Sequence, residues 1–480
     1  MAGASALLLL YTAVLSVLAL YGAHRLWLLW VYWRRRPPPQ AVAPVDWPVV
    51  TVQLPLYNER LVAERLIRAV SLLDYPADRL QIHVLDDSTD ETAVICDQVT
   101  AELREAGVDI RVLRRVGREG FKAGALREGA KHARGDIFAI FDADFVPPRD
   151  FLKRTIPHLH GEVGMVQVRW GHLNLDESWL TLAQGALLDG HFVIEHTARY
   201  SGGRWFNFNG TAGVWRRQAI EDGGGWQDDT LTEDLDLSYR VQLAGWRFVY
   251  LDDVVAPAEL PSSIAAFRSQ QHRWAKGAAQ TARKMLGAIW RARVPLGTKV
   301  EATVHLTANT GYPFVLALSL LMPWAAWART AGAPSLVVLD LLLFVAASVS
   351  VFLFYGVAVW RAGAGVPGRV ARVPVALALG LGMAASQTRA VVQGLIGPIG
   401  EFVRTPKAGS GGSGSYTVAS ALPMPELFLA VYMTISVVWA MSQQLYPSVP
   451  FLALFAFGYA IVGASVIGDR LRASARAIPR

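Results

Sequence analysis

Residues 137–144 read Ile-Phe-Ala-Ile-Phe-Asp-Ala-Asp, a short apolar run that ends in two acidic residues. β-Branched and aromatic residues dominate the run Ile137–Phe141, which indicates a buried β-strand. Asp142 and Asp144 follow two residues apart. Because side chains alternate between the two faces of a strand, we expect both carboxylates on one face. The stretch therefore predicts a strand that presents two oxygen ligands at its carboxyl end.

Similar strand-like runs precede this stretch, and helix-like stretches separate them. The expected strands are Val49–Leu54, Ile82–Leu85 and Ile110–Leu113, with helices that include Glu59–Leu73 and Thr92–Glu105. Alternating strands and helices predict a mostly parallel sheet covered by helices. Ligands of such α/β sheets bind beyond the carboxyl ends of the strands. Polar clusters stand at those ends, namely Asn58-Glu59, Asp86-Asp87 and Asp142–Asp144.

The composition of the whole chain does not suit a soluble protein. Of its 480 residues, 52% are hydrophobic and 18% are charged, against roughly 25% charged residues in ordinary globular domains. The single cysteine, Cys96, cannot form an internal disulfide, which excludes a disulfide-stapled scaffold. So much apolar surface favours a protein that is partly embedded in a membrane.

The charge is divided unevenly along the chain. Residues 1–45 carry four basic side chains and no acidic one, and residues 302–480 carry eleven basic and four acidic side chains. The central residues, 46–301, hold 31 basic and 35 acidic side chains. Basic residues that flank apolar segments follow the positive-inside rule of membrane proteins, so the net charge of +7 does not indicate a nucleic-acid partner. Most carboxylates lie in the centre, where we expect the chemistry.

The first 36 residues predict a transmembrane anchor. Met1–Ala23 carries no charge, and the apolar run continues through several aromatic residues to Arg34–Arg36. A cleaved signal peptide would have a basic start, a shorter apolar core and an Ala-x-Ala site, and the segment has none of these. We expect its N-terminus outside and its arginines inside. A catalytic domain over residues 46–284 then lies in the cytosol.

Residues 285–480 predict four more membrane-spanning helices, about five in all, and one interfacial segment. Pro374–Ile399 is apolar, but Gln387, Arg389 and Gln393 interrupt it, and an arginine at a helix centre costs about 2.5–3.5 kcal/mol on insertion scales. If this segment lies at the interface, the arginines of the C-terminal tail stay inside. The segments long enough to span are Val304–Trp327, Leu336–Trp360, Glu426–Gln443 and Phe451–Ile467.

The acidic strand end has two interpretations. Asp-x-Asp is common by chance, and a solvated strand end would also explain Asp142 and Asp144. The carboxylates could instead hold Mg²⁺ or Mn²⁺ against a pyrophosphate, because both are hard oxygen ligands. The stretch Val84–Thr92 has the same form, and helix capping would leave its Asp86 and Asp87 unexplained.

The segment Thr230-Leu-Thr-Glu-Asp-Leu-Asp236 also allows two interpretations. Thr230 and Glu233 match a Thr-x-x-Glu capping box, so Glu233 could be purely structural. The box does not explain Asp234, whose carboxylate a helix N-terminus would keep ionised. An ionised and positioned carboxylate could serve as a general base.

A further motif, Gln270-Gln-His-Arg-Trp274, precedes the membrane segments. An amphipathic interfacial helix with Trp274 at the lipid headgroups would explain it. Alternatively, Arg273 binds a diphosphate and Trp274 stacks on a sugar ring.

Taken in order, these motifs resemble the processive family-2 glycosyltransferases, and most closely the cellulose-synthase-like mannan and glucan synthases. The resemblance runs from about Val49 to Lys284 and includes Phe121-Lys-Ala-Gly-Ala-Leu126 and Phe208-Asn-Gly-Thr-Ala-Gly213. It implies a cytosolic α/β domain of the GT-A type, together with membrane helices that form an exit channel for a glycan.

A weaker match, Glu401-Phe-Val-Arg-Thr-Pro-Lys407, resembles the gating loop of that family. We place this loop over residues 401–424, where Phe402 and Thr405 would close over the donor. The Gly/Ser tract Gly409–Ser415 within it is either native or an inserted linker.

The resemblance also implies roles for single residues. Asp234 would be the general base, with Glu233 beside it, and Arg273 would meet the diphosphate. Asp144, with Asp142, would hold the divalent metal. Contacts with the nucleotide sugar or the acceptor would come from Asp86, Asp87, Lys122, Asp142, Asn209, Gln270, Trp274 and Thr405.

One departure narrows the family. Cellulose synthases carry Phe-x-Cys-Gly beside the acceptor, whereas residues 206–210 here read Phe-Asn-Phe-Asn-Gly. The difference favours the mannan and glucan synthase branch. The expected activity is inverting transfer of a hexose from GDP-mannose or UDP-glucose to a growing β-(1,4)-linked polysaccharide. We expect the enzyme to secrete this product. We also expect it to be an integral protein of the bacterial inner membrane.

Three alternatives remain. A related enzyme would add a single sugar to a lipid acceptor and make no polymer. A glycoside hydrolase also uses two carboxylates, but needs neither a metal-binding Asp-x-Asp nor a nucleotide. A transporter would place polar sites within its spans, whereas Asp340 is the one acidic residue inside an expected span after residue 302.

Overall fold

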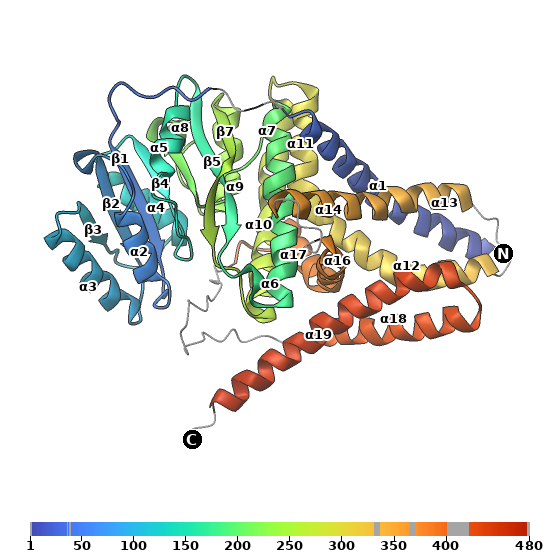
Figure 1. Ribbon diagram of the computed structural model, residues 1–480. Helices are drawn as coiled ribbons and strands as arrows, with labels where there is room; N and C mark the ends of the chain where they lie inside the picture. The colour runs from blue at the N-terminus through green and yellow to red at the C-terminus, as the bar shows by residue number, and fades with distance from the viewer. Residues whose placement is uncertain are drawn as a thin grey trace.

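The computed structural model describes residues 2–35, 37, 40–330, 337–363, 370–400 and 422–477. A twisted sheet with its covering helices occupies one end of the molecule, and long helices extend away from it (Figure 1). Most of the expected gating loop, including Phe402 and Thr405, and the whole tract Gly409–Ser415 lie outside the described residues.

Within the described residues, seven strands form one sheet in the order β3-β2-β1-β4-β6-β5-β7. All neighbours pair in parallel except β6, which runs antiparallel to both β4 and β5. The predicted mostly parallel sheet is therefore confirmed. The strands are β1 (Val50–Leu56), β2 (Leu80–Asp86), β3 (Ile110–Leu113), β4 (Ile137–Ile140), β5 (Val163–His172), β6 (Gly213–Arg216) and β7 (Arg247–Ala258).

Helices cover both faces of the sheet, which explains why β1 and β2 are buried along almost their whole length. Their polar side chains are buried as well, at Thr51, Gln53, Gln81 and His83. Side chains that alternate along a strand enter two separate apolar clusters: Val52 lies in one, and Phe138 of the neighbouring strand lies in the other. The helices of this part are α2 (Ala63–Ser71), α3 (Thr92–Glu105), α4 (Phe121–Lys131), α5 (Phe151–Thr155), α6 (Trp179–Asp189), α7 (Thr197–Ser201), α8 (Arg217–Asp222), α9 (Glu233–Leu243) and α10 (Ile264–Arg291).

The remaining helices are long and apolar. In the described part of the chain, five helices are long and apolar enough to cross a membrane: 3–33, 296–329, 342–362, 424–442 and 446–472. They agree with the five spans expected from the sequence. The elements are α1 (Ala2–Trp33), α11 (Leu296–Thr307), α12 (Gly311–Thr330), α13 (Val337–Phe344), α14 (Ser350–Ala362), α16 (Val373–Gly382), α17 (Ala384–Ile396), α18 (Met424–Ser442) and α19 (Val449–Ala477).

The ambiguous apolar segment forms α16 and α17, which meet at an angle of 53°. The helix α17 packs against α10 of the α/β domain, where His272 hydrogen-bonds Gln393 over 3.0 Å and Arg283 donates to the Leu395 carbonyl over 3.0 Å. Arg389 is exposed on α17, and an arginine facing the centre of a bilayer is costly. These contacts favour a bent interfacial segment that rests on the catalytic domain.

The two ends of the chain support the same topology. The N-terminus lies at the far end of the long helices, and α19 returns the C-terminus to the side of the sheet (Figure 1). Five spans with the N-terminus outside would place the C-terminal tail on the cytosolic side, together with the sheet.

Two single-cysteine variants test this topology from either end of α19. In a Cys96→Ser background, Gln443→Cys lies before α19 and Ser474→Cys lies near its end, both at exposed positions. Five spans put residue 443 outside and residue 474 inside, whereas a sixth span through α16 and α17 reverses the two. In intact cells, a membrane-impermeant thiol reagent should label Gln443→Cys and spare Ser474→Cys.

The control is Val116→Cys, at a fully exposed position in the α/β domain, which the reagent should not reach from outside. Labelling of Ser474→Cys with protection of Gln443→Cys would overturn the five-span topology.

Candidate active site

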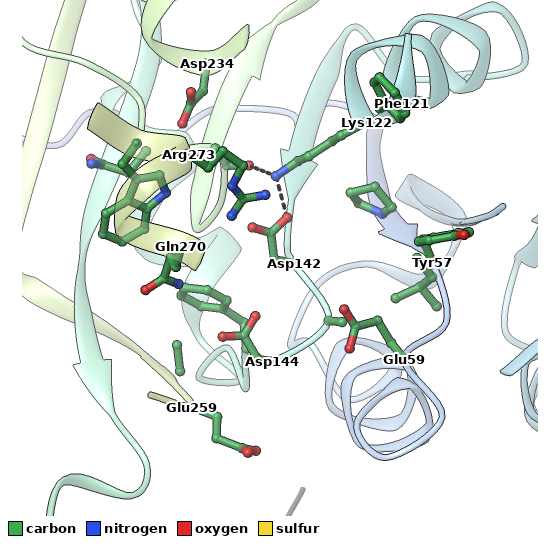
Figure 2. Close-up of a pocket in the computed structure, with 18 of the residues that line it drawn as sticks. Tyr57, Glu59, Phe121, Lys122, Asp142, Asp144, Asp234, Glu259, Gln270 and Arg273 are labelled. Atoms are coloured by element: carbon green, nitrogen blue, oxygen red, sulfur yellow. Dashed lines mark hydrogen bonds and ion pairs between the residues drawn. The ribbon is translucent and has the colours of Figure 1, made fainter. Parts of the chain in front are cut away.

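A cleft that is partly open to solvent lies beyond the carboxyl ends of the strands. Side chains from the strand ends, from α4, from α9 and from α10 point into it (Figure 2). It is therefore in the place where α/β sheets bind their ligands. The expected site residues that line it are Asp87, Lys122, Asp142, Asp144, Asn209, Glu233, Asp234, Gln270, Arg273 and Trp274.

Asp142 and Asp144 reach the cleft by a different route from the one predicted. The strand β4 ends at Ile140, so the two aspartates lie in the turn that follows it, and Phe145 N donates to the Asp142 carbonyl over 3.1 Å. The expectation that strand alternation aligns them was wrong. The turn instead brings both residues to the same cleft (Figure 2).

Lys122 fixes the position of Asp142. Its ammonium group forms a close ion pair with the Asp142 carboxylate and donates to the Gly210 carbonyl over 2.9 Å. Burial opposes the charge of Lys122, but Asp142 and Glu233 outweigh it and raise the pKa of the lysine. Lys122 is therefore a fixed positive charge between the turn after β4 and the loop before β6.

The acidic residues of the cleft fit a metal that arrives with a substrate. Asp144 is 8% exposed, and the described residues contain no group of three or more acidic, histidine or cysteine side chains that could hold a metal ion. Mg²⁺ commonly uses one or two carboxylates together with phosphate oxygens and water. Asp144 and Asp142 could supply those carboxylates, and the remaining ligands would come from phosphate groups and water.

Glu233 and Asp234 start the helix α9, but not through the predicted capping box. Thr232 occupies the N-cap position without a side-chain cap bond, and the Thr230 hydroxyl is buried with no partner among the described residues. That prediction was wrong because α9 begins at Glu233, so Thr230 lies two residues before the N-cap position. Gln280 of α10 accepts a hydrogen bond from Leu231 N over 3.0 Å, and the Glu233 side chain lines the cleft.

Asp234 is not held in the ionised form that the sequence suggests. Burial, followed by the nearby charge of Glu233, raises its pKa from 3.8 to about 7. Lys122 and a 2.8 Å hydrogen bond from Leu235 N oppose this shift without cancelling it. The expectation of a fully ionised carboxylate was therefore wrong for the donor-free cleft. A pKa near the working pH is nevertheless the value that favours general base catalysis.

Gln270, Arg273 and Trp274 lie on α10 at positions i, i+3 and i+4, which share one helix face. That face lines the cleft, which disfavours the interpretation as a lipid-facing interfacial helix. Burial lowers the pKa of Arg273, opposed by the charges of Glu233, Asp142, Asp234 and Asp144. The guanidinium is therefore the cation that faces the acidic side of the cleft (Figure 2).

The two aspartates after β2 behave differently from each other. Asp87 lines the cleft, with both carboxylate oxygens bound by Arg115. Asp86 is 2% exposed, pairs with Arg114 over 2.9 Å and is not among the lining residues. Asp87 therefore lies where a ligand of the cleft could reach it, whereas Asp86 braces the strand end.

Several residues of the cleft were missed as single site residues by the sequence analysis. Tyr57 has the Arg118 guanidinium 3.3 Å above its ring, which forms an aromatic and cationic wall. The sequence held a signal for four of these missed residues, because each one ends a strand or closely follows it. They are Tyr57, Glu59, His172 and Glu259. The missed lining residues include Tyr57, Glu59, Arg118, Trp170, His172 and Glu259.

Comparisons with known proteins agree with this architecture. Residues 48–277 match the family model described as glycosyltransferase like family 2. The chain is 49% identical over 295 residues to glucomannan 4-beta-mannosyltransferase 1 of Oryza sativa subsp. japonica, an alignment that covers 58% of this chain and 56% of the rice protein. The chain thus spans little more than half the length of this relative.

Two further similarities bear on the family and the fold. Probable glucomannan 4-beta-mannosyltransferase 11 of Arabidopsis thaliana is 42% identical over 297 residues, which cover 58% of this chain and 67% of that protein. The structure of the mannosyltransferase PcManGT from Pyrobaculum calidifontis, in complex with GDP-Man and Mn²⁺, superposes with a TM-score of 0.50 at 25% identity. It covers 78% of this chain and 99% of PcManGT.

The cleft and the sequence similarity thus agree: a GT-A type sheet carries the Asp-x-Asp turn, the Thr-Glu-Asp helix start and the Gln-Gln-His-Arg-Trp helix around one cavity. The chain belongs to glycosyltransferase family 2, and within it to the cellulose-synthase-like branch of mannan synthases that the plant relatives represent.

Proposed function

We propose that the protein is a membrane-integrated inverting glycosyltransferase that transfers a hexose, mannose first, from a nucleoside diphosphate sugar to a growing β-(1,4)-linked glycan. The observation that carries this proposal is the meeting of Asp234, Arg273 and the Asp142–Asp144 turn in one cleft. The names of the plant relatives support a 4-β-mannosyl product. The complex of PcManGT supports GDP-mannose as the donor and a divalent metal as the cofactor.

The chemistry follows from the positions of the charged groups. Asp234 accepts the proton of the acceptor hydroxyl, whose oxygen forms a bond with the anomeric carbon. The bond from that carbon to the diphosphate breaks, and its electron pair leaves with the diphosphate. Arg273 and Lys122 stabilise the departing negative charge. Displacement from the opposite side converts an α-linked donor into a β-linked product.

A bound Mg²⁺ or Mn²⁺, held by Asp144 with Asp142, would neutralise further charge on the diphosphate. The turn after β4 places these carboxylates beside Arg273, so protein and metal charges would act on the same leaving group. Glu233 is adjacent to the base, and its charge contributes to the raised pKa of Asp234.

The membrane helices support a further part of the proposal. We infer an anchor over residues 1–36, a cytosolic catalytic domain over 46–284, and a membrane region over 285–480 through which the glycan is secreted. The comparisons give no support to a bacterial inner membrane, because the two glucomannan mannosyltransferases described above are plant proteins. A lipid acceptor that receives one sugar is the alternative, and the product length distinguishes the two.

A panel of radiolabelled donors on the purified protein tests the function. We expect incorporation from GDP-mannose in the presence of Mn²⁺ or Mg²⁺, as a ladder of products that a β-(1,4)-mannanase digests. EDTA should abolish transfer, and Asp144→Asn should be nearly inactive although folded. Transfer from UDP-glucose alone would change the donor, a single addition would favour the lipid acceptor, and full activity in EDTA would exclude the metal.

Asp234→Asn tests the general base. The substitution keeps the size of the side chain but removes its proton acceptor, so turnover should fall by roughly 10²–10⁴-fold. Donor affinity, measured by nucleotide-sugar binding, should remain because Arg273 and the Asp142–Asp144 turn are intact. Near-normal turnover in Asp234→Asn would contradict the assignment, and Glu233→Gln would then be the next variant to test.

The raised pKa of Asp234 also predicts a dependence of stability on pH. The pKa is about 7 in the folded donor-free protein and 3.8 in the reference state. The protonated form is favoured by folding, so its contribution is fully present below pH 4 and is lost as the pH rises through 7. In EDTA without donor, the melting temperature of the wild type should fall relative to Asp234→Asn between pH 6 and pH 8.5.

Asp136→Asn is the matched control, because the Asp136 side chain is 94% exposed and its loss should leave the pH dependence unchanged. A constant difference in melting temperature between wild type and Asp234→Asn across this pH range would show that the carboxylate is not destabilised by burial.

A further inference from the structure

The carboxamide of Asn209 is held at both ends by histidines. Its Nδ2 atom lies 2.8 Å from His191 Nε2, and its Oδ1 atom lies 2.5 Å from His196 Nε2. The centroids of the two imidazole rings are 4.4 Å apart. The backbone N–H of Asn209 donates to Gln167 Oε1 over 3.0 Å. An asparagine at the edge of the cleft is thus fixed in both its backbone and its side chain.

A π-helix makes this arrangement possible. Gly190–His196 forms a π-helix between α6 and α7, so residues five apart come into register. In an α-helix of 3.6 residues per turn, His191 and His196 would point about 140° apart. The wider turn brings both rings to the same asparagine. The π-helix therefore positions His191 and His196 on Asn209.

The hydrogen-bond directions leave one donor of Asn209 unused by the protein. Burial lowers the pKa of His196 well below its usual range, so its neutral ring donates from Nε2 to the Asn209 oxygen. His191 then accepts from Asn209 Nδ2 and donates from Nδ1 to Glu195 Oε2 over 3.1 Å. An amide nitrogen carries two hydrogens, and the second meets no protein acceptor within the described residues, although Asn209 lines the cleft.

The support behind His191 continues to the membrane region. Arg199, which is 2% exposed, binds Glu195 over 3.1 Å and Glu301 of α11 over 2.8 Å. The other oxygen of Glu301 lies 2.7 Å from His24 of α1. Burial opposes the charge of Glu195, but Arg199 and His191 outweigh it and hold its pKa well below the usual range. The asparagine is thus connected, through ion pairs and hydrogen bonds, to the first helix of the chain.

We propose that Asn209 donates its free amide hydrogen to a hydroxyl of the acceptor sugar, and that His191, braced by Glu195 and Arg199, is the positioning residue that orients this amide. The inference rests on the proposed glycosyl transfer. Asn209 shares the cleft with Trp274 and with Asp234, so an acceptor hydroxyl delivered to the base passes close to the amide. The orienting network makes acceptor affinity depend on a residue that does not line the cleft.

A double-mutant cycle separates positioning from a general structural effect. The assay uses the active donor of the panel and the matching β-(1,4)-linked oligosaccharide as the acceptor. His191→Ala should raise the acceptor KM about three- to tenfold, as expected for one misplaced hydrogen bond, with unchanged donor KM and melting temperature. In the Asn209→Ala background, His191→Ala should add no further effect on the acceptor KM. His191→Gln, whose side-chain oxygen can accept from Asn209, should restore part of the loss.

His191 is the suitable position because its side chain is 27% exposed and its removal leaves the ion pair between Glu195 and Arg199 in place. Removal of Arg199 would take the shared cation from Glu195 and from the buried Glu301 and would destabilise the protein. His132→Ala is the matched control, because the His132 side chain is 55% exposed at the C-terminal end of α4 and does not line the cleft.

Two outcomes would overturn the inference while leaving the proposed function intact. The first is a wild-type acceptor KM in His191→Ala. The second is an equal rise of the acceptor KM when His191→Ala is introduced into wild type and into Asn209→Ala. Failure of the proposed function would differ from both, since the wild-type protein itself would then transfer no sugar from any donor.

Discussion

The arrangement of the cleft depends on an electrostatic balance that must hold before any substrate is bound. Asp142, Asp144, Glu233 and Asp234 bring four carboxylates together, and burial penalises the charges of Glu233 and Asp234. Lys122 offsets part of this penalty, and it also pairs with Asp142 and donates a hydrogen bond to the Gly210 carbonyl. Arg273 faces the same group from α10. The balance is incomplete, because the pKa of Asp234 rises to about 7. If cations paired with every carboxylate oxygen, the cleft would offer neither a base nor a metal ligand. The incomplete pairing of the carboxylates is therefore consistent with the proposed chemistry.

The helix α10 joins the catalytic chemistry to the membrane region. Its Gly277 packs against Thr232, where an added Cβ would lie 2.5 Å from Thr232 Cγ2, so α10 closely braces the start of α9. On its cleft face the same helix carries Arg273. Elsewhere its Arg268 pairs with the buried Glu426 of α18 over 2.7 Å, and His272 bonds to α17. A displacement of α10 would therefore move Arg273, the proposed diphosphate contact, together with the start of α9, which carries the proposed base. This argues for a rigid unit at the membrane surface.

The sequence was sufficient for the first four strands and several helices, because their signals are local, whereas β5, β6 and β7 were not predicted. Thr92–Glu105 was predicted with the bounds that α3 has, and the first four strands were placed within a few residues. The capping box failed for the opposite reason. Thr230 and Glu233 have the correct spacing, but α9 begins at Glu233 with Thr232 at the N-cap position, and Leu231 N beside it bonds Gln280, which is 49 residues further along the chain. The Asp-x-Asp pair reached the cleft through a turn that periodicity does not describe. Thr405 lies outside the described residues, and its role stays a prediction.

The two histidines that hold Asn209, His191 and His196, show where local sequence patterns stop being informative. A search for the 3.6-residue period of the α-helix does not detect a π-helix. The groups that complete the network are also distant in the sequence, since His24 comes from α1 and Glu301 from α11. The individual residues are ordinary polar side chains when read alone. Burial gives the network its effect, since Arg199 between two carboxylates cannot be released without exposing uncompensated charge. The helix α1 is thereby tied to the side of the cleft where Asn209 lies, so the long apolar helices contribute to the geometry of the site as well as to its location.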